Sequence, residues 1–510
     1  MAKPISILNH VLGPVMRGPS SSHSAASLRI GRLCRDLLGG RVTAVDCEYD
    51  PNGSLATTHL SQGSDLGLIG GLLGWEASDS RLLEYREHAR AAQLRFDVHT
   101  VELGATHPNT YRLQVYNGEE HHQLTALSLG GGMIEVIDID GLRVSMEGDQ
   151  YVLIALGADG RAKASLGSMA PFTQAEISEF QLQAGAAAVR QLAPVVPVCG
   201  ADDTQVPFQT VAGMQQYDDA AGVQSLPALA LAYEAQRSGL SEPELRERVG
   251  EILAIMRESL RVGRAGTDYA DRILPSQVGR YQQANAAGQL LGGACFNDVV
   301  TAVTSVLEAK SAMQVLVAAP TAGSCGVIPG ALLGVAESAN FDDATLVDGL
   351  LTAGLIGVFI ATGATFAAEE GGCMAECGSA SGMAAAALVV MSGGSTEQAL
   401  AAASQALQNA FGMTCDTVAN RVEAPCLGKN TMAAANALAA ANMALAGFDP
   451  LIPLDEVIVA MAEVGRQMPR ELRCTGLGGI AVCPSSKAIE VRLVDAESKP
   501  LPGSQQSSTL

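Results

Sequence analysis

The feature that most constrains the fold is a change in residue pattern near residue 211. Upstream, segments rich in β-branched residues alternate with helix-like segments; downstream, Ala- and Gly-rich helical stretches follow one another with few strand formers. With 510 residues, the chain also exceeds the usual size of one hydrophobic core. We therefore predict a multidomain α+β protein, with an α/β domain over residues 1–146, a linker over 147–210, an all-helical domain over 211–484 and a flexible tail over 485–510.

Individual elements of the first domain can be placed from their patterns. A helix is predicted from Ala25 to Leu38, because its apolar residues recur at helical spacing. Strands are expected within residues 42–50, 94–103, 110–118 and 134–146. In the expected linker, one short apolar run is followed by a Pro-containing stretch, which is typical of a connection between domains.

The charge balance excludes several classes of partner. The chain has 53 acidic and 32 basic residues and a formal net charge of −21, which repels phosphate backbones and anionic lipid surfaces. We therefore expect no nucleic acid and no membrane as partner. No basic region followed by an apolar run opens the sequence, and the end of the chain has no anchor signal. A cytoplasmic protein is expected.

One uncharged segment, Gly349 to Ala368, is long enough to cross a bilayer. It lacks flanking basic residues and aromatic belts, and it runs directly into Glu369 and Glu370. The pattern favours a helix buried inside a large helical domain over a membrane span.

The distribution of histidine constrains where catalysis can occur. All eight histidines, from His10 to His122, lie in the first domain. A metal in the helical half must therefore take Cys, Asp or Glu from that half, and an imidazole acid or base must reach it across the domain interface. We expect the active site between the domains.

Two segments of the first domain contain candidate catalytic residues. Ser20, Ser21, Ser22, His23 and Ser24 directly precede the predicted helix. Free N–H groups at a helix start favour an anion, and His23 is of a type that titrates near neutrality; an ordinary capped helix explains the pattern equally well.

The second segment is His107-Pro108-Asn109-Thr110, where the proline restricts His107 to an extended conformation. On pattern alone, a simple turn is the stronger interpretation.

The eleven cysteines are expected to be reduced thiols, and three of them attract attention. Cys373, Cys415 and Cys426 lie in Gly-containing segments of the helical half, without histidine nearby in the sequence. Three thiolates suit an iron–sulfur cluster with one open iron. Cys377 could complete a zinc site through its Cys-x3-Cys spacing, and plain buried thiols are a third possibility.

Read together, the segments resemble the iron–sulfur L-serine dehydratases along nearly the whole chain. In the first domain the resemblance rests on GPVMRGPSSSHSAASLRIGR, QGSDLGLIGGLL, HPNT and LGGGMIEV. In the second it rests on APTAGSCGVIPG, GGCMAECGSASGMAAAALVVMSGGSTEQAL, GMTCDTVANRVEAPCLGKN and MPRELRCTGLGGIA. The first domain is similar to that family's β part and the second to its α part, here fused in one chain.

The resemblance implies a function and a set of site residues. It implies a lyase that converts L-serine to pyruvate and ammonia, an activity of amino-acid catabolism that supplies gluconeogenesis, in a homodimer without pyridoxal phosphate. Cys373, Cys415 and Cys426 would hold a [4Fe-4S] cluster. The catalytic residues would be His23, His107, Asn109 and Arg473, and the substrate-binding serines would be Ser20, Ser21, Ser22 and Ser24.

Departures from the family leave alternatives open. The family's Asn-Ala-Ala-Met stretch reads Ser311-Ala312-Met313 after Lys310, its Ser-Gly pair reads Ala367-Ala368, its Cys-Asp-Pro reads Cys415-Asp416-Thr417, and Cys325 and Cys474 are unusual at their positions. A paralogue acting on threonine, cysteine or a non-amino hydroxy acid is one alternative, and a catalytically silent iron–sulfur sensor is another. Cys483 is a candidate for a temporary fourth ligand of the kind that some relatives have at their C-terminus.

Overall fold

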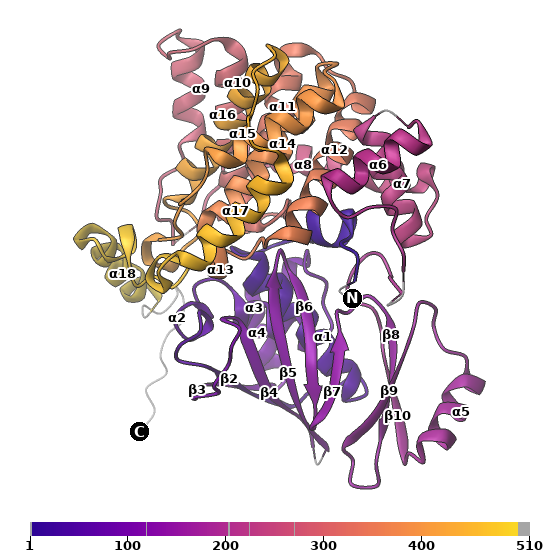
Figure 1. Ribbon diagram of the computed structural model, residues 1–510. Coiled ribbons are helices and arrows are strands. Elements are labelled where there is room, and N and C mark those ends of the chain that lie inside the picture. Colours follow the sequence, from indigo (N-terminus) through magenta and orange to yellow (C-terminus); the bar gives the residue numbers. More distant parts are fainter. Residues whose placement is uncertain (1–2, 119, 202–203, 224, 270, 498–510) are drawn as a thin grey trace.

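The protein consists of a helical body stacked on a sheet domain, as the computed structural model shows (Figure 1). The structure describes residues 3–118, 120–201, 204–223, 225–269 and 271–497. Helices dominate the half after residue 211, and the six-stranded sheet lies in the half before it. The multidomain α+β architecture predicted from the residue pattern is confirmed.

The sheet domain has six strands in the order β3-β2-β4-β5-β6-β7. Neighbouring strands are antiparallel except β2 and β3, which run parallel. The strands are β2 (Ala44–Tyr49), β3 (Arg95–Thr100), β4 (Thr110–Asn117), β5 (Glu120–Gly130), β6 (Met133–Ile139) and β7 (Leu142–Met146). In β2 and β5, buried residues alternate with half-buried or exposed ones, which is the pattern of a sheet with one face in the core.

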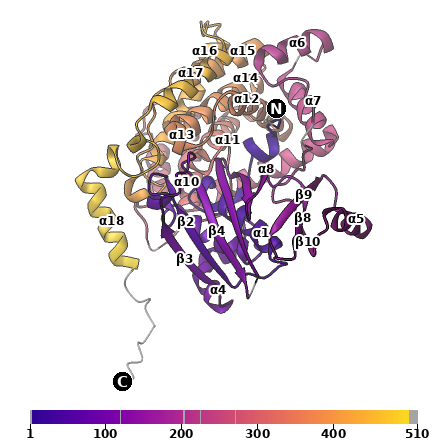
Figure 2. The ribbon, with the colours of Figure 1, turned by 60° about the horizontal axis from the view of Figure 1, so that its bottom comes forward.

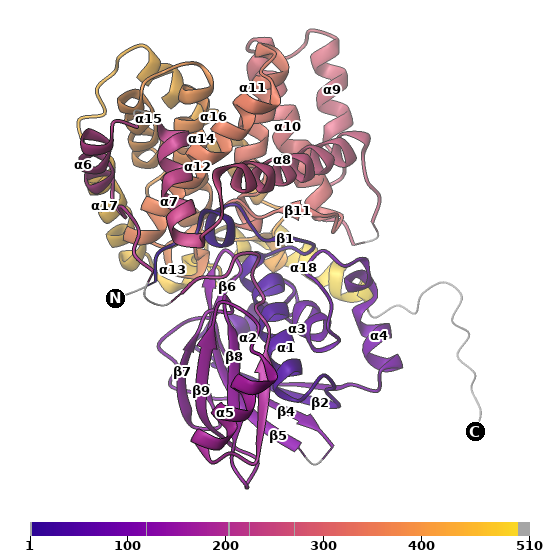
Figure 3. The same cartoon turned by 90° about the vertical axis from the view of Figure 1, so that its right-hand side faces the viewer.

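Helices cover one face of this sheet (Figure 3). They are α1 (Ala26–Leu37), α3 (Ser64–Leu72) and α4 (Tyr85–Ala91), with the short α2 (Leu55–Thr58) and η3 (Ser80–Glu84) between them in the chain. The buried side chains of α1, among them Ile30 and Leu33, pack in one cluster with Val45 and Leu113 of the sheet. The predicted helix from Ala25 to Leu38 is therefore present, and its apolar face meets the sheet.

Residues 147–210 contain more structure than the expected linker. Three antiparallel strands in the order β10-β8-β9 form a small sheet with one helix: β8 (Tyr151–Leu156), β9 (Ala162–Ser168), α5 (Gln174–Ala184) and β10 (Ala188–Leu192). Only β8 is a continuous apolar run, and it packs against the core of the first domain. β9 is mostly exposed and rich in Ala, Ser and Gly, so it has little strand signal.

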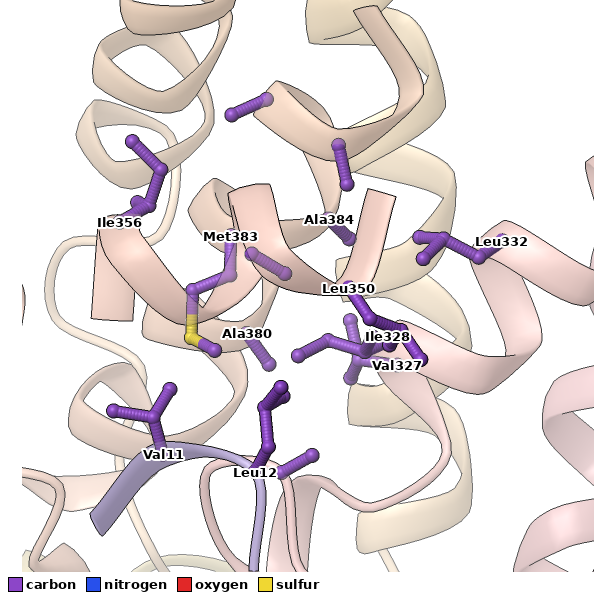
Figure 4. Close-up of a cluster of buried hydrophobic side chains, with 14 of the residues drawn as sticks. Val11, Leu12, Val327, Ile328, Leu332, Leu350, Ile356, Ala380, Met383 and Ala384 are labelled. Atoms are coloured by element: carbon purple, nitrogen blue, oxygen red, sulfur yellow. The ribbon is translucent and has the colours of Figure 1, made fainter. Parts of the chain in front are cut away.

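The helical body is built around α12 and α14 (Figure 4). Its long helices are α6 (Val211–Ala221), α7 (Leu226–Ser238), α8 (Glu242–Ala265), α9 (Val278–Ala286), α10 (Ala294–Ser311), α11 (Val327–Ala339), α12 (Asp343–Gly363), α14 (Ser379–Met391), α15 (Thr396–Gln408), α16 (Cys426–Leu445) and α17 (Leu454–Gln467). Shorter pieces are η4 (Ala322–Ser324), α13 (Ala368–Cys373), η5 (Met374–Gly378), η6 (Val418–Asn420), η7 (Arg470–Leu472) and η8 (Gly479–Val482). Alanines such as Ala380 and Ala384 are fully buried, and their small size lets the helices pack closely.

Three helical segments are long and apolar enough to cross a membrane by length and composition: Ala322–Ala339, Asp343–Gly363 and Ala368–Met391. Within the protein they are 83%, 72% and 89% buried, respectively. The uncharged segment from Gly349 thus begins inside α12, where neighbouring helices cover it, as the sequence predicts.

The N-terminal segment belongs to the helical body, although the sequence places it in the first domain. The π-helical turn η1 (Ile7–Val11) packs against α12, where Gly354 and Gly357 leave room for Ile7 and Val11. Figure 4 shows Val11 beside Met383 of α14. Next, β1 (Val15–Met16) pairs with β11 (Leu316–Val317) of the helical half. The structural boundary between the two bodies therefore lies after residue 16 as well as near residue 211.

The end of the described chain is helical. Residues 484–497 form α18 (Pro484–Glu497) at the edge of the molecule (Figure 2). The expected flexible tail therefore begins with a helix, and residues 498–510 lie outside the described part of the chain.

Candidate active site

His23 lies at the interface of the two bodies, in the π-helical turn η2 (Ser21–Ala25) that leads into α1. Its Nε2 is 2.8 Å from Oγ1 of Thr58, and its Nδ1 is 3.1 Å from Oγ of Ser20. Thr58 already donates its hydroxyl proton to the carbonyl of Ser54 at 2.7 Å, so it accepts from Nε2–H of His23. The lone pair of the neutral imidazole then lies on Nδ1, on the side of Ser20.

Burial keeps this imidazole neutral. His23 is fully buried, and burial together with the nearby His59 lowers its pKa from 6.5 to about 3. Oε1 of Glu369, from α13, is 3.5 Å from Nδ1 of His23. A neutral Nδ1 beside a carboxyl group is suited to accept and pass on a proton.

The serine loop is not used as one unit. Ser20 lines a small cavity next to the cysteines, whereas Oγ of Ser21 accepts from the backbone N–H of Ala322 at 3.2 Å. The hydroxyl of Ser24 donates to the carbonyl of Gln62 at 3.2 Å. Ser20 thus lines the cavity, whereas the Ser21 and Ser24 hydroxyls bond to protein groups and the backbone carbonyl of Ser22 accepts from Ser128. Substrate binding by these four serines stays a prediction.

Cys373, Cys415 and Cys426 lie close together beside the small cavity, which Cys415, Cys426 and Ser20 line. All three are buried; Sγ of Cys373, Sγ of Cys415 and a carboxylate oxygen of Glu376 lie within 4.8 Å of one another. Burial raises the pKa of the Cys426 thiol, although the Lys310 ammonium opposes this shift. The three thiols come from α13, from a strand-like bridge at residue 415 and from the start of α16.

A lysine provides positive charge at this cluster of thiols. Nζ of Lys429 is 3.9 Å from Sγ of Cys373 and is fixed by the Thr414 carbonyl at 2.5 Å and by Asp416 at 2.6 Å. Burial lowers the pKa of Lys429, but Cys373 and Asp416 outweigh it and raise that pKa overall. A fixed ammonium beside sulfur favours thiolate, the form that binds metal.

The donor set fits an iron–sulfur cluster. Sulfur ligands dominate, and imidazole is absent from the three thiols' own half of the chain. Cys415 and Cys426 line a cavity of about 10 Å³, room for one water, and Cys373 lies next to Cys415. Cys474 adds a fourth buried thiol to the same wall, next to Cys415.

The other two cysteines noted in the sequence lie elsewhere. Sγ of Cys377 accepts from the Asn430 side-chain amide at 3.6 Å; it lies close enough to Cys373 and Cys426 to interact electrostatically with them, but it is not part of the cavity wall. Cys483 is exposed at the start of α18 and does not line the cavity either.

A larger cavity of about 470 Å³ adjoins the thiols and opens between the two bodies. His107 and Arg473 line it, together with Glu369 and Glu370. Nε2 of His107 is 3.3 Å from Oε1 of Glu370, and Nη1 of Arg473 donates to the backbone carbonyl of Glu370 at 3.4 Å. Glu369 lines both cavities, so it stands between the open one and the thiols.

Several buried polar atoms at this site have no hydrogen-bond partner among the described residues. Oε2 of Glu369 and Nε of Arg473 are two of them. Nε2 of His107 and the side-chain amide of Asn109 also lack a well-aligned hydrogen bond, although they lie beside Glu370 and Glu369, respectively. Buried polar groups are normally paired, and an unpaired one is costly. Their concentration at one interdomain cavity indicates a polar ligand.

The structure thus brings together Ser20, His23, His107, Asn109, Arg473 and the three cysteines. Sequence reasoning missed Thr58, Glu369, Glu370, Glu376 and Lys429 as site residues. Glu369 and Glu370 had a visible signal, because a pair of carboxylates ends a long uncharged segment. Thr58 had none, since a single threonine in a short helix is common.

Comparisons with known proteins agree with this geometry. Residues 214–481 match the family model described as serine dehydratase alpha chain. The alpha chain of L-serine dehydratase from Peptoniphilus asaccharolyticus is 42% identical over 255 residues, which are 50% of this chain and 87% of that one. L-serine dehydratase of Streptomyces coelicolor is 30% identical over 502 residues, covering 91% of this chain and 96% of the relative.

L-serine dehydratase 1 of Escherichia coli (strain K12) is 28% identical over 501 residues, with the same coverage of 91% and 96%. These two relatives span the sheet domain as well as the helical body. The family model covers more than half of the 510 residues. The chain belongs to the serine dehydratase family, with the alpha-chain part in its helical body.

Proposed function

We propose that this protein is an L-serine ammonia-lyase, which removes water from L-serine and releases pyruvate and ammonia. The observation that carries the proposal is the convergence of three buried thiols, a neutral imidazole and unpaired polar atoms at one interdomain site. The full-length relatives named L-serine dehydratase support the same reaction.

Cys373, Cys415 and Cys426 are the proposed ligands of a [4Fe-4S] cluster. Bound by three thiolates, such a cluster supplies an open iron that acts as a Lewis acid toward a β-hydroxyl. No pyridoxal phosphate is part of this proposal.

The chain's own residues bind the substrate and move its proton. Arg473 is the proposed partner of the substrate carboxylate, because its side chain lines the larger cavity and its Nε has no protein partner among the described residues. His23 is the proposed base for the Cα proton, since Nδ1 holds the free lone pair and Thr58 fixes the opposite nitrogen. His107 and Asn109 complete the pocket, and Ser20 donates toward Nδ1 of His23 when the base is free.

Removing single thiols from anoxically purified protein tests this proposal. We expect wild-type protein to be brown, to contain iron and sulfide, and to release equal amounts of ammonia and pyruvate from L-serine. Cys373→Ser, Cys415→Ser and Cys426→Ser should each lose the colour. Cys377→Ser is the matched control and should keep it, because Cys377 is equally buried but its Sγ accepts from the Asn430 side-chain amide. Colourless protein that is active with stoichiometric zinc would refute the cluster.

The cellular setting is also part of the proposal. We place the enzyme in the cytoplasm, as a homodimer acting in amino-acid catabolism that supplies gluconeogenesis, with no membrane and no nucleic-acid partner. The burial of the three apolar helical segments and the net charge of −21 support this setting. Light scattering after size-exclusion chromatography measures the oligomeric state directly.

A further inference from the structure

Glu369 is a buried carboxyl group with no charged cation from the described residues beside it. It lies in the first turn of α13, is 5% exposed, and its Oε2 has no hydrogen-bond partner among the described residues. His23 is the basic side chain that pairs with it, and burial holds that imidazole neutral. A buried carboxylate is costly unless a positive charge meets it.

The groups around Glu369 come from four segments and supply no such charge. They are His23 and Ser20 from the first turn of the sheet domain, His107 and Asn109 from the loop before β4, Glu370 and Glu376 from its own segment, and Cys415 and Cys474 from the wall of the small cavity. Asn109 offers Glu369 a neutral amide hydrogen bond and no charge. Lys429 is engaged by Asp416 and Thr414. Within the described residues, Glu369 therefore lacks a charged cationic partner from the protein.

Two arginines line the larger cavity. Arg470 donates to the backbone carbonyls of residues 51–53, whereas the hydrogen-bonding groups of Arg473 are only partly used by the protein. Its Nη1 bonds the backbone carbonyl of Glu370, which leaves Nε buried and unpaired. Both Arg473 and Glu369 line the cavity of about 470 Å³. The lining of this cavity thus includes an arginine and a carboxyl group that each keep one buried polar atom without a protein partner.

We infer that Glu369 and Arg473 form a zwitterion site, in which Arg473 binds the α-carboxylate and Oε2 of Glu369 binds the α-ammonium of an amino acid. This inference rests on the proposed function and specifies which substrates the pocket binds. The pocket selects 2-amino acids over 2-hydroxy acids of the same shape. Glu369 lies between the open cavity and the thiols, so an ammonium held there orients the rest of the ligand toward the cluster site.

A positioning role toward His23 would leave a different signature. If Glu369 only assisted the imidazole, its loss would lower kcat and leave the choice between ammonium and hydroxyl ligands unchanged. If Glu369 binds the ammonium, its loss removes that choice and raises KM as well. Ligands that cannot react separate the two roles without relying on turnover.

The test measures binding of L-alanine and L-lactate to anoxically purified holoenzyme by isothermal titration calorimetry. The two ligands share a carboxylate and a methyl group and differ in carrying an ammonium or a hydroxyl. We expect wild-type protein to prefer L-alanine, and Glu369→Gln to weaken L-alanine binding by about 10- to 100-fold, the range for losing a hydrogen bond to a charged group. L-lactate binding should change by less than about 3-fold.

Two further variants and the iron content make the result decisive. Glu471→Gln removes the same charge from an exposed residue near Arg473 and should keep the wild-type preference. Glu369→Asp keeps the charge and should retain part of the preference for L-alanine over L-lactate. If Glu369→Gln loses iron, Glu369→Asp still tests whether the carboxylate binds the ammonium.

Unchanged L-alanine binding in Glu369→Gln, or equal losses for both ligands, would overturn the inference. Wild-type protein that prefers L-alanine but forms no pyruvate from L-serine would instead refute the proposed function and leave the zwitterion site standing.

Discussion

Exchanging Gly357 for alanine tests how the N-terminal segment is held in the helical body. Gly357 lies in α12, and a methyl group there would overlap Cγ1 of Val11, which is fully buried. Overpacking of this kind costs about 1–3 kcal/mol. Alanine gains about 1 kcal/mol over glycine within a helix, so we expect a net loss of roughly 0–2 kcal/mol.

Shortening Val11 should reverse the sign of that effect. Val11→Ala alone removes two methyl groups from the core and should cost about 2–3 kcal/mol, including the cavity. In this background the new methyl group of Gly357→Ala meets only Cε of Met383, at 3.2 Å, and a methionine side chain adapts readily. The second substitution should then stabilise the protein by about 1 kcal/mol, a coupling of roughly 2 kcal/mol.

Urea unfolding of the four proteins, followed by circular dichroism, measures the cycle. The midpoints give the free energies of unfolding, and equal m values show that the same surface is exposed in each variant. If Gly357→Ala had the same effect with valine and with alanine at position 11, the two residues would not be in contact. The N-terminal segment would then not be docked on α12.

Three other predictions follow from the site and the interface. His23→Ala should abolish nearly all pyruvate release and keep the brown cluster, which assays of activity and of iron content can separate. Fragments 1–150 and 205–510, expressed separately, should each be inactive, and activity in either one would contradict an interdomain site. The second fragment should also be poorly soluble, because it lacks the core side chains Ile7 and Val11. Glu147→Gln should stabilise the protein at pH 8 and not at pH 4.5. Burial, and after it the charge of Asp149, raises the pKa of Glu147 to about 7, so the folded protein loses stability as the pH rises from 4.5 to 7. The loss is at most about 3 kcal/mol, and solvent screening reduces it. Urea midpoints across this pH range test the sign.

Sequence patterns located the two bodies and most of the first domain. The helix at α1 and the expected strands around β2, β3, β4, β6 and β7 are present, because each has the apolar periodicity of an element with one buried face. β5, the longest strand of the sheet, was not predicted. Its first half contains Glu120, His121, His122 and Gln123, and a hydrogen bond between His122 and Asp140 replaces the apolar signal.

The site was partly accessible to sequence reasoning for a physical reason. The residues found from sequence are those whose chemistry is unusual for their position, such as clustered cysteines or a histidine after three serines. The residues missed act through geometry: Thr58 matters because its hydroxyl orients His23, and Glu369 because burial leaves its oxygen unpaired. Neither property is visible until distant segments are placed together.

The docking of η1 on α12 has a consequence for synthesis of the chain. Val11 leaves the ribosome 346 residues before Gly357, the residue that receives it. At about 5–20 residues per second, the interval is roughly 20–70 s. During that time the apolar segment around Ile7, Leu8, Val11 and Leu12 has no permanent partner and can attach to other nascent chains. The N-terminal segment can dock only after α12 has been synthesised. Chaperones that bind the N-terminal segment of the nascent chain should therefore affect the yield of folded enzyme more than chaperones that bind the chain after its release from the ribosome.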